Sequence, residues 1–122
     1  MSALPLAMIV EDDPQLSKIF AISLKSEFTI ETITDGEIAL ARLGQVAPQI
    51  IVLDLHLPGK SGASILAYIR SDERLEKAIV ILATADARQA DALADQADIV
   101  LLKPVSPVQL RALASRLRSS VS

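Results

Sequence analysis

The stretch Ile50-Ile51-Val52-Leu53-Asp54 contains four large apolar residues, three of them β-branched, and an acid follows them directly. A run with no polar alternation is typical of a strand that is buried on both faces of a parallel sheet. Two runs of the same kind occupy positions 7–10 (Ala-Met-Ile-Val) and 79–82 (Ile-Val-Ile-Leu). The three runs predict the central strands of one sheet.

Five apolar runs in all alternate with segments of helical periodicity, which is the pattern of βαβ units. The run at 28–33 alternates more with polar residues, so we expect it at an edge. The pattern predicts an α/β fold: a flavodoxin-like, doubly wound parallel sheet in the order 2-1-3-4-5, with five helices and right-handed crossovers. The expected strands are Leu6–Val10, Phe28–Ile33, Ile50–Leu53, Ile79–Ala83 and Ile99–Leu102.

Each expected helix follows a strand and begins near a residue suited to cap its amino end. Segment 84–98 holds one large aliphatic residue, Leu93, so the fourth helix should be the most weakly anchored. The predicted caps are Asp13, Asp35, Ser61 or Gly62, Asp86 and Ser106. The predicted core-facing residues are Leu16, Ile19, Phe20, Ser23 and Leu24 in the first helix and Leu110, Leu113 and Leu117 in the last.

The composition limits the class of protein. The 122 residues are 51% hydrophobic and 22% charged, so we expect one globular domain over 1–122, structured over about 5–120. A net charge of −3 argues against direct nucleic-acid binding. The chain has no cysteine and one histidine, His56, which excludes thiolate chemistry and a zinc cluster. No apolar run reaches the ~18 residues that span a bilayer, so we expect a cytoplasmic protein without membrane association.

Polar residues follow four of the expected strands. Glu11 and Asp12 come after the first strand, Asp54 after the third, Thr84 after the fourth and Lys103 after the fifth. Parallel strands place such residues at one edge of the sheet, where doubly wound folds bind their ligands. The sequence therefore predicts a site built from residues far apart in the chain.

Carboxylates gathered in one crevice repel one another, so they either have raised pKa values or recruit a cation. A set of oxygen ligands suits Mg²⁺, which commonly uses one or two carboxylates together with a substrate phosphate. We expect Asp12 and Asp54 to be direct ligands, Glu11 to act through water, and the backbone carbonyl of His56 to complete the protein ligands.

An aspartate beside a metal ion can act as a nucleophile toward phosphorus and form an aspartyl-phosphate. We expect Asp54 to be this phosphoacceptor. Lys103 would offset the charge of the phosphoryl oxygens, and the hydroxyl of Thr84 would donate to one of them.

Simpler interpretations exist for each residue taken alone. The acids at 11–13 suit a helix amino terminus, Asp54 suits a turn, Thr84 a helix cap and Lys103 a solvated charge. None of these interpretations explains why all the groups meet at one edge. His56 is more simply an exposed loop residue. The arginines near the end of the chain, Arg111, Arg116 and Arg118, suit a solvated helix face.

Four motifs together resemble the response regulator receiver domain of two-component signalling, over about the whole chain. The motifs are Ile-Val-Glu-Asp-Asp-Pro at 9–14, Val-Leu-Asp-Leu-His-Leu-Pro-Gly-Lys-Ser-Gly at 52–62, Leu-Ala-Thr-Ala at 82–85 and Leu-Lys-Pro at 102–104. The resemblance implies that Glu11 and Asp12 are the acidic pair, Asp54 the phosphoacceptor, Thr84 the switch hydroxyl and Lys103 the phosphate-pairing lysine.

Two positions depart from the family pattern. Three residues before the lysine the family usually has Tyr or Phe, whose ring moves inward with the threonine on phosphorylation, but this chain has Val100. The resemblance therefore implies altered transmission of the signal. Gln96 stands where a glycine is common, which should change the turn into the fifth strand.

Other positions resemble modulators of the family reaction. His56 and Asp86, two residues past the phosphoacceptor and the threonine, resemble positions that tune phosphoryl lifetime, and we count Ala85 among the modulators. A His56–Asp86 pair that gates attacking water is a hypothesis. The resemblance also implies a cis peptide bond between Lys103 and Pro104, against a general frequency of about 5–6% for X-Pro bonds.

The first functional hypothesis is a phosphorylation-dependent switch. Its phosphodonor would be a histidine kinase or phosphotransfer protein, and its output surface would be the fourth helix, fifth strand and fifth helix, which also offer a homodimer surface. A downstream partner, or an effector domain beyond residue 122, would receive the signal. Apart from its own phosphorylation and dephosphorylation, the domain would not be an enzyme.

Two alternatives differ in class. One is a receiver-like interaction module that has lost signalling, suggested by Val100. The other is a phosphatase of the haloacid dehalogenase type, which also uses an Asp nucleophile with Mg²⁺. Chain order disfavours the phosphatase, because that family begins with its nucleophile and usually has a second Asp two residues on, where this chain has His56.

Overall fold

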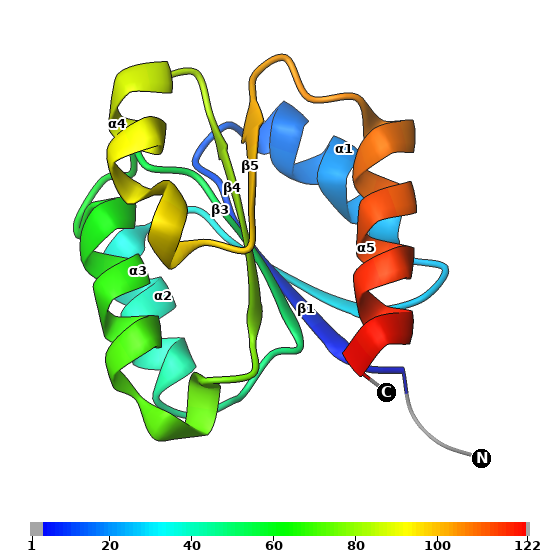
Figure 1. The fold of residues 1–122 in the computed structure, drawn as a ribbon, viewed down its shortest axis with the longest axis horizontal. Coiled ribbons are helices and arrows are strands. Elements are labelled where there is room, and N and C mark those ends of the chain that lie inside the picture. Colours follow the sequence, from blue (N-terminus) through cyan, green and yellow to red (C-terminus); the bar gives the residue numbers. More distant parts are fainter. Residues whose placement is uncertain (1–3, 122) are drawn as a thin grey trace.

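A computed structural model describes the backbone of residues 4–121 and the side-chain surroundings of residues 4–116. Its five parallel strands form one sheet in the order β2-β1-β3-β4-β5 (Figure 1), as the sequence predicts. The weakly alternating strand β2 lies at an edge. The strands are β1 (Leu6–Val10), β2 (Thr29–Ile33), β3 (Ile50–Leu53), β4 (Ile79–Thr84) and β5 (Ile99–Leu102).

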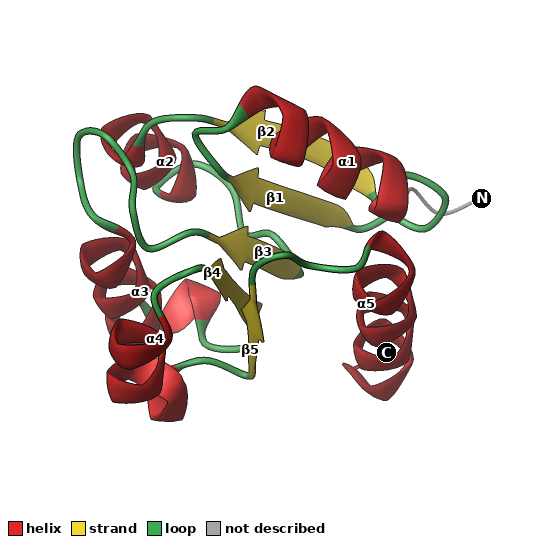
Figure 2. Ribbon diagram, turned by 90° about the horizontal axis from the view of Figure 1, so that it is seen from above, coloured by secondary structure: helices red, strands yellow, loops and turns green. Residues whose placement is uncertain are grey.

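The helices cover both faces of the sheet. Helices α1 and α5 lie on one face, and α2, α3 and α4 lie on the other (Figure 2). Among the described residues, no helix is both long and apolar enough to cross a membrane. The helices are α1 (Pro14–Leu24), α2 (Gly36–Leu43), α3 (Gly62–Ser71), α4 (Ala87–Leu93) and α5 (Pro107–Val121), with 3₁₀ turns at Glu73–Leu75 and Ala94–Gln96.

Strands β1, β3 and β4 feed two cores at once, because successive side chains point to opposite faces. In β1, Met8 and Val10 belong to the core under α2, α3 and α4, whereas Ala7 and Ile9 belong to the core under α1 and α5. All residues of β3 and β4 are buried. This burial on both faces explains the uninterrupted apolar runs of these strands.

Side-chain carboxylates and hydroxyls cap the helices where the sequence predicts. Asp13 accepts hydrogen bonds from the backbone N–H groups of Gln15 and Leu16, and Asp35 does the same for α2. Ser61, rather than Gly62, caps α3. The caps Asp86 and Ser106 accept hydrogen bonds from the N–H groups of Gln89 and Gln109.

Some details of the sequence-based prediction are wrong. Ile19 was expected in the core but is 40% exposed, and Ser17 is buried in its place. The buried stripe of α1 is rotated about the helix axis relative to the predicted stripe, because α1 packs against α5 as well as against the sheet. Strand β2 begins at Thr29, although Phe28 is buried, and β4 extends through Thr84. The predicted stripe residue Leu117 and the charge of Arg118 lie outside the described side chains.

Helix α4 is short and weakly anchored, as expected. Its only buried residue is Ala90, and Leu93 packs partly against the core. The chain then tightens into the 3₁₀ turn Ala94–Gln96 before it enters β5.

The start of α3 fixes the backbone next to Asp54. The N–H of Gly62 donates to the carbonyl of Leu55 at 3.0 Å, and a Cβ at position 62 would overlap the carbonyl group of Asp54. We therefore expect Gly62→Ala to lower the free energy of unfolding by about 1–3 kcal/mol, the usual cost of overpacking. Urea unfolding followed by circular dichroism measures this change.

Gly44→Ala is the matched control. Its Cβ would lie 3.4 Å from the carbonyl oxygen of Ala41, an ordinary contact, and the φ of −73° suits alanine. This variant should be neutral or stabilised by up to about 1 kcal/mol. Equal destabilisation by the two substitutions would contradict the role given to Gly62.

Candidate functional site

The parallel register brings the predicted residues to one edge of the sheet. The N–H of Asp54 donates to the carbonyl of Val10 at 3.0 Å, which sets Asp54 beside Glu11. The N–H of Lys103 donates to the carbonyl of Thr84 at 2.9 Å, which sets Lys103 beside the end of β4. Residues from four strands thus gather at their carboxyl ends.

Lys103 joins two buried acids at this edge. Its Nζ lies 2.8 Å from Oε1 of Glu11 and 3.2 Å from Oδ2 of Asp54. Glu11 is 1% exposed and Asp54 is 5% exposed, so one ammonium group serves two carboxylates that are shielded from water. The three groups carry a net charge of −1 when all are ionised.

Burial changes the acid–base behaviour of this cluster. Burial raises the pKa of the Glu11 carboxyl and the charge of Asp54 adds to the rise, although pairing with Lys103 partly offsets it. Burial by itself lowers the pKa of Lys103, but pairing with Glu11 and the charge of Asp54 outweigh this effect and raise that pKa. Lys103 is therefore held as a cation.

A third acid completes a group that suits a metal ion. Oxygens of Glu11, Asp12 and Asp54 all lie within 4.8 Å of one another, and Asp12 is exposed. Oε1 of Glu11 is buried and makes no hydrogen bond of good geometry within the described residues, despite its closeness to Lys103. An oxygen-only group of carboxylates that opens to solvent at Asp12 fits a hard divalent cation such as Mg²⁺.

The loops after β3 and β4 meet at the mouth of the site. Oδ1 of Asp54 accepts from the N–H of His56 at 3.3 Å, and Oγ1 of Thr84 accepts from the N–H of Asp86 at 3.1 Å. Asp54 therefore also forms the turn that its simpler interpretation predicts. Nε2 of His56 lies 3.3 Å from Oδ2 of Asp86, so the two loops are linked by their side chains.

The remaining predicted residues lie around this mouth. His56 has a side chain that is 64% exposed, which agrees with its simpler interpretation as a loop residue, yet it contacts Asp86. Ala85 is exposed, and Val100 is partly buried against the core under α2, α3 and α4. The Lys103–Pro104 bond is cis, the conformation that the resemblance implies.

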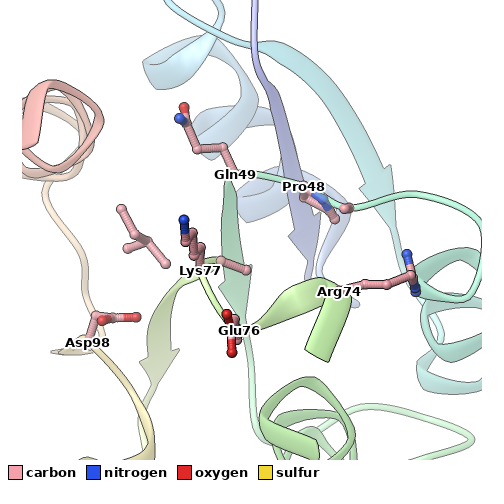
Figure 3. A pocket seen from close by; sticks show the side chains of 9 residues that line it. Pro48, Gln49, Arg74, Glu76, Lys77 and Asp98 are labelled. Atoms are coloured by element: carbon pink, nitrogen blue, oxygen red, sulfur yellow. The ribbon is translucent and has the colours of Figure 1, made fainter. Parts of the chain in front are cut away.

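A well-formed pocket of the described residues lies elsewhere (Figure 3). Its lining includes Gln49, just before β3, and Ile79, at the start of β4, so it stands at the amino ends of the strands. Arg74 also lines the pocket, and its guanidinium donates a hydrogen bond to the carbonyl of Leu43 and forms an ion pair with Asp72. The acids and Lys103 are at the opposite end of the sheet, and this pocket takes no part in their chemistry.

A family model described as the response regulator receiver domain matches residues 7–115. The chain belongs to this family. The DNA-binding response regulator MtrA of Mycolicibacterium smegmatis is 33% identical over 116 residues, which cover 91% of this chain and 50% of that protein. The phosphate regulon regulator PhoB of Rhizobium meliloti is 34% identical over 113 residues, covering 89% and 50%. This receiver domain thus spans about half the length of these relatives.

Solved structures agree with this assignment. The BeF3-activated receiver domain of DrrB, a response regulator of Thermotoga maritima, has a TM-score of 0.86 and 27% identity, covering 96% of this chain and 99% of that one. The fold is therefore the receiver fold, and the chain is the receiver domain of a two-component response regulator.

Sequence reasoning missed one feature of this receiver domain. It assigned Glu11 to an outer metal position and Lys103 to the phosphoryl group, but the structure pairs the two directly. The available signal was the register of the sheet, because it sets Glu11 beside Asp54 and within reach of the long lysine side chain.

The neighbouring acids Asp12 and Asp13, which follow β1, should differ in their effect on Mg²⁺ binding. We expect Asp12→Asn to weaken Mg²⁺ binding by at least about tenfold, because it removes one ligand charge from the cluster. Asp13→Asn should leave Mg²⁺ affinity within about twofold, because Asp13 caps α1 and asparagine caps equally well. Isothermal titration calorimetry measures both affinities, and equal losses would contradict the assignment of Asp12.

Proposed function

We propose that this receiver domain accepts a phosphoryl group on Asp54 and transmits the change to its surface. The observation that carries the proposal is the buried Asp54 carboxylate, which is paired with Lys103 and adjoins Glu11 and Asp12. Burying an ionised carboxylate such as Asp54 is costly unless a cation lies beside it. A carboxylate that acts as a phosphoryl acceptor needs the same neighbouring cations, because they also offset the charge of the phosphoryl oxygens.

In the proposed transfer, an oxygen of Asp54 forms the new bond to phosphorus. The bond between phosphorus and the donor atom breaks, and its electron pair stays on the donor atom; a histidine donor also takes up a proton from water, whereas acetyl phosphate leaves as acetate. Lys103, already held as a cation, pairs with a phosphoryl oxygen. The hydroxyl hydrogen of Thr84 is available to donate to another, because its oxygen already accepts from the N–H of Asp86.

The metal contribution rests on three acids and one carbonyl. Asp12 and Asp54 would bind Mg²⁺ directly, Glu11 through water, and His56 through its backbone carbonyl. When bound, the ion offsets the negative charge of phosphoryl oxygens. The ammonium group of Lys103 offsets part of the negative charge of Glu11 and Asp54.

The partners follow from the chemistry and from the relatives. The phosphodonor would be a histidine kinase or a phosphotransfer protein. MtrA is named a DNA-binding response regulator, and this chain spans about half of it. We therefore propose that an effector domain of a longer protein, or a separate partner, receives the signal, and that the receiver domain itself does not contact nucleic acid.

The proposed output surface consists of α4, β5 and α5. Strand β5 contains Val100 and ends at Leu102, next to Lys103. Leu102 pairs with Thr84 in the sheet, so changes at the phosphoryl group would reach this surface over a short path. The same surface would serve a homodimer. Val100 stands where the family usually has an aromatic residue that moves on phosphorylation. This replacement favours a second candidate function, an interaction module whose binding does not depend on phosphorylation.

Intact mass after incubation with Mg²⁺ and acetyl phosphate tests the central proposal. We expect one added phosphoryl group on the unaltered protein and none on Asp54→Asn. Asp35→Asn, which changes an acid that caps α2 and does not belong to the acid cluster, should be phosphorylated normally. No added mass on the unaltered protein would favour the interaction module, and addition to Asp54→Asn would assign the acceptor elsewhere.

The His56–Asp86 contact should control how long the phosphoryl group survives. If the pair screens attacking water, His56→Ala and Asp86→Asn each speed dephosphorylation several-fold, and the double variant is no faster than either single variant, because both remove one contact. Loss of phosphoryl mass over time measures the rates. Unchanged rates in His56→Ala would remove this role.

A further inference from the structure

The loop between β3 and α3 passes beside the amino end of α2 (Figure 2). The N–H of Gly36, the first residue of α2, donates to the carbonyl of Pro58 in this loop at 2.9 Å. The first N–H groups of a helix have no partner inside the helix, and Gly36 is buried, so its N–H needs an acceptor from another segment. The loop provides that acceptor, and the helix end holds the loop.

The contact is possible because Gly36 has no side chain. A Cβ at position 36 would overlap the carbonyl oxygen of Lys60 and lie 2.8 Å from the backbone nitrogen of the same residue. Both atoms belong to the backbone, so any side chain at position 36 requires the loop to move away from α2. Gly36 thus fixes the loop at two points, through a hydrogen bond at Pro58 and a close backbone contact at Lys60.

Side-chain packing contributes little to the position of this part of the loop. The side chains of Pro58 and Lys60 are exposed, and Leu57 is only partly buried against the core under α2, α3 and α4. The backbone contacts with Gly36 are therefore the main constraint on positions 58–60.

The same loop reaches the acid cluster at its other end. The N–H of His56 donates to Oδ1 of Asp54 at 3.3 Å, and one residue, Leu57, separates His56 from Pro58. A shift of the held segment would therefore move the backbone carbonyl of His56. Mg²⁺ demands near-ideal octahedral geometry with ligand distances of about 2.0–2.1 Å, so a small shift of a ligand carbonyl weakens its binding.

We propose that Gly36 is a positioning residue for the metal ion: its backbone contact with the loop holds the carbonyl of His56 where Mg²⁺ binds. The inference rests on the proposed function in taking that carbonyl as a ligand. Gly36 lies outside the acid cluster and supplies no ligand itself. Helix α2, which carries none of the predicted site residues, thereby contributes to metal binding.

Gly36→Ala tests the inference in a titration with MgCl₂. We expect the affinity for Mg²⁺ to fall about tenfold, the lower end of the loss that follows when a group that orients a metal ligand is removed. Isothermal titration calorimetry measures the affinity, and circular dichroism establishes that the variant is folded. Unchanged affinity in folded Gly36→Ala would overturn the inference.

Two variants at the other end of α2 are the controls. Gly44→Ala makes the same substitution where a Cβ has room, and Leu43→Val lowers stability by shortening a buried side chain that does not touch the loop backbone. Substitutions at separate sites act independently, so both variants should bind Mg²⁺ within about twofold of the unaltered protein. A tenfold loss in Leu43→Val as well would assign the effect to lost stability and overturn the inference.

Hydrogen exchange in the unaltered protein decides the question if Gly36→Ala does not fold. The amides of Gly36 and Gly44 stand at the two ends of α2, and helix ends open locally without unfolding of the domain. If the loop contact favours Mg²⁺ binding, bound Mg²⁺ favours the contact by the same factor. In ¹⁵N–¹H spectra, saturating MgCl₂ should therefore slow exchange at Gly36 about tenfold and at Gly44 less than about twofold. No slowing at Gly36, or equal slowing at both, would overturn the inference.

The two proposals fail independently. Metal affinity and amide exchange are measured without a phosphodonor, and phosphorylation of Asp54 is measured by intact mass. A domain that is phosphorylated on Asp54 but binds Mg²⁺ equally well with alanine at position 36 would refute the role of Gly36 alone. A domain that shows the Gly36 effects but takes up no phosphoryl group would refute the proposed function alone.

Discussion

The structure depends on one ammonium group between two buried carboxylates. Glu11 and Asp54 are almost inaccessible to water, and two such charges at the end of an apolar sheet would be expensive if unpaired. Lys103 offsets that cost and is itself held charged by the same contacts. The arrangement leaves one net negative charge and an exposed acid, Asp12, that a cation would neutralise.

The parallel sheet makes this cluster possible. Glu11 directly follows β1, Asp54 follows β3 and Lys103 follows β5, and backbone hydrogen bonds to the neighbouring strands fix these three positions. Two apolar cores, one on each face, hold the strands in register, so side chains up to 92 positions apart meet without any local sequence motif joining them. Gly62 adds a local requirement, because any side chain there would collide with the backbone of Asp54.

Much of this could be read from the sequence because burial on both faces leaves a strong signal. The strands β1, β3 and β5 have the predicted bounds, and the caps Asp13, Asp35 and Asp86 lie where short polar side chains precede a helix. The prediction was wrong for Ile19, because helical periodicity does not tell which neighbour, sheet or α5, the stripe faces. The Glu11–Lys103 pair was missed for a similar reason: spacing brings groups to one edge, but side-chain length and burial decide which of them touch.

In the proposed function, Val100 bears on the transmission of the signal and not on its acceptance. It lies outside the acid cluster, so its small size does not alter the charges around Asp54. It does leave β5 and the alanines of α4 without a bulky side chain between them, close to Leu102, the sheet partner of Thr84. Under the proposed function, a change at Thr84 would reach β5 through its pairing with Leu102, without the contacts that an aromatic ring at position 100 would add. Under the proposed function, phosphoryl acceptance and its transmission would therefore depend on different residues of this chain.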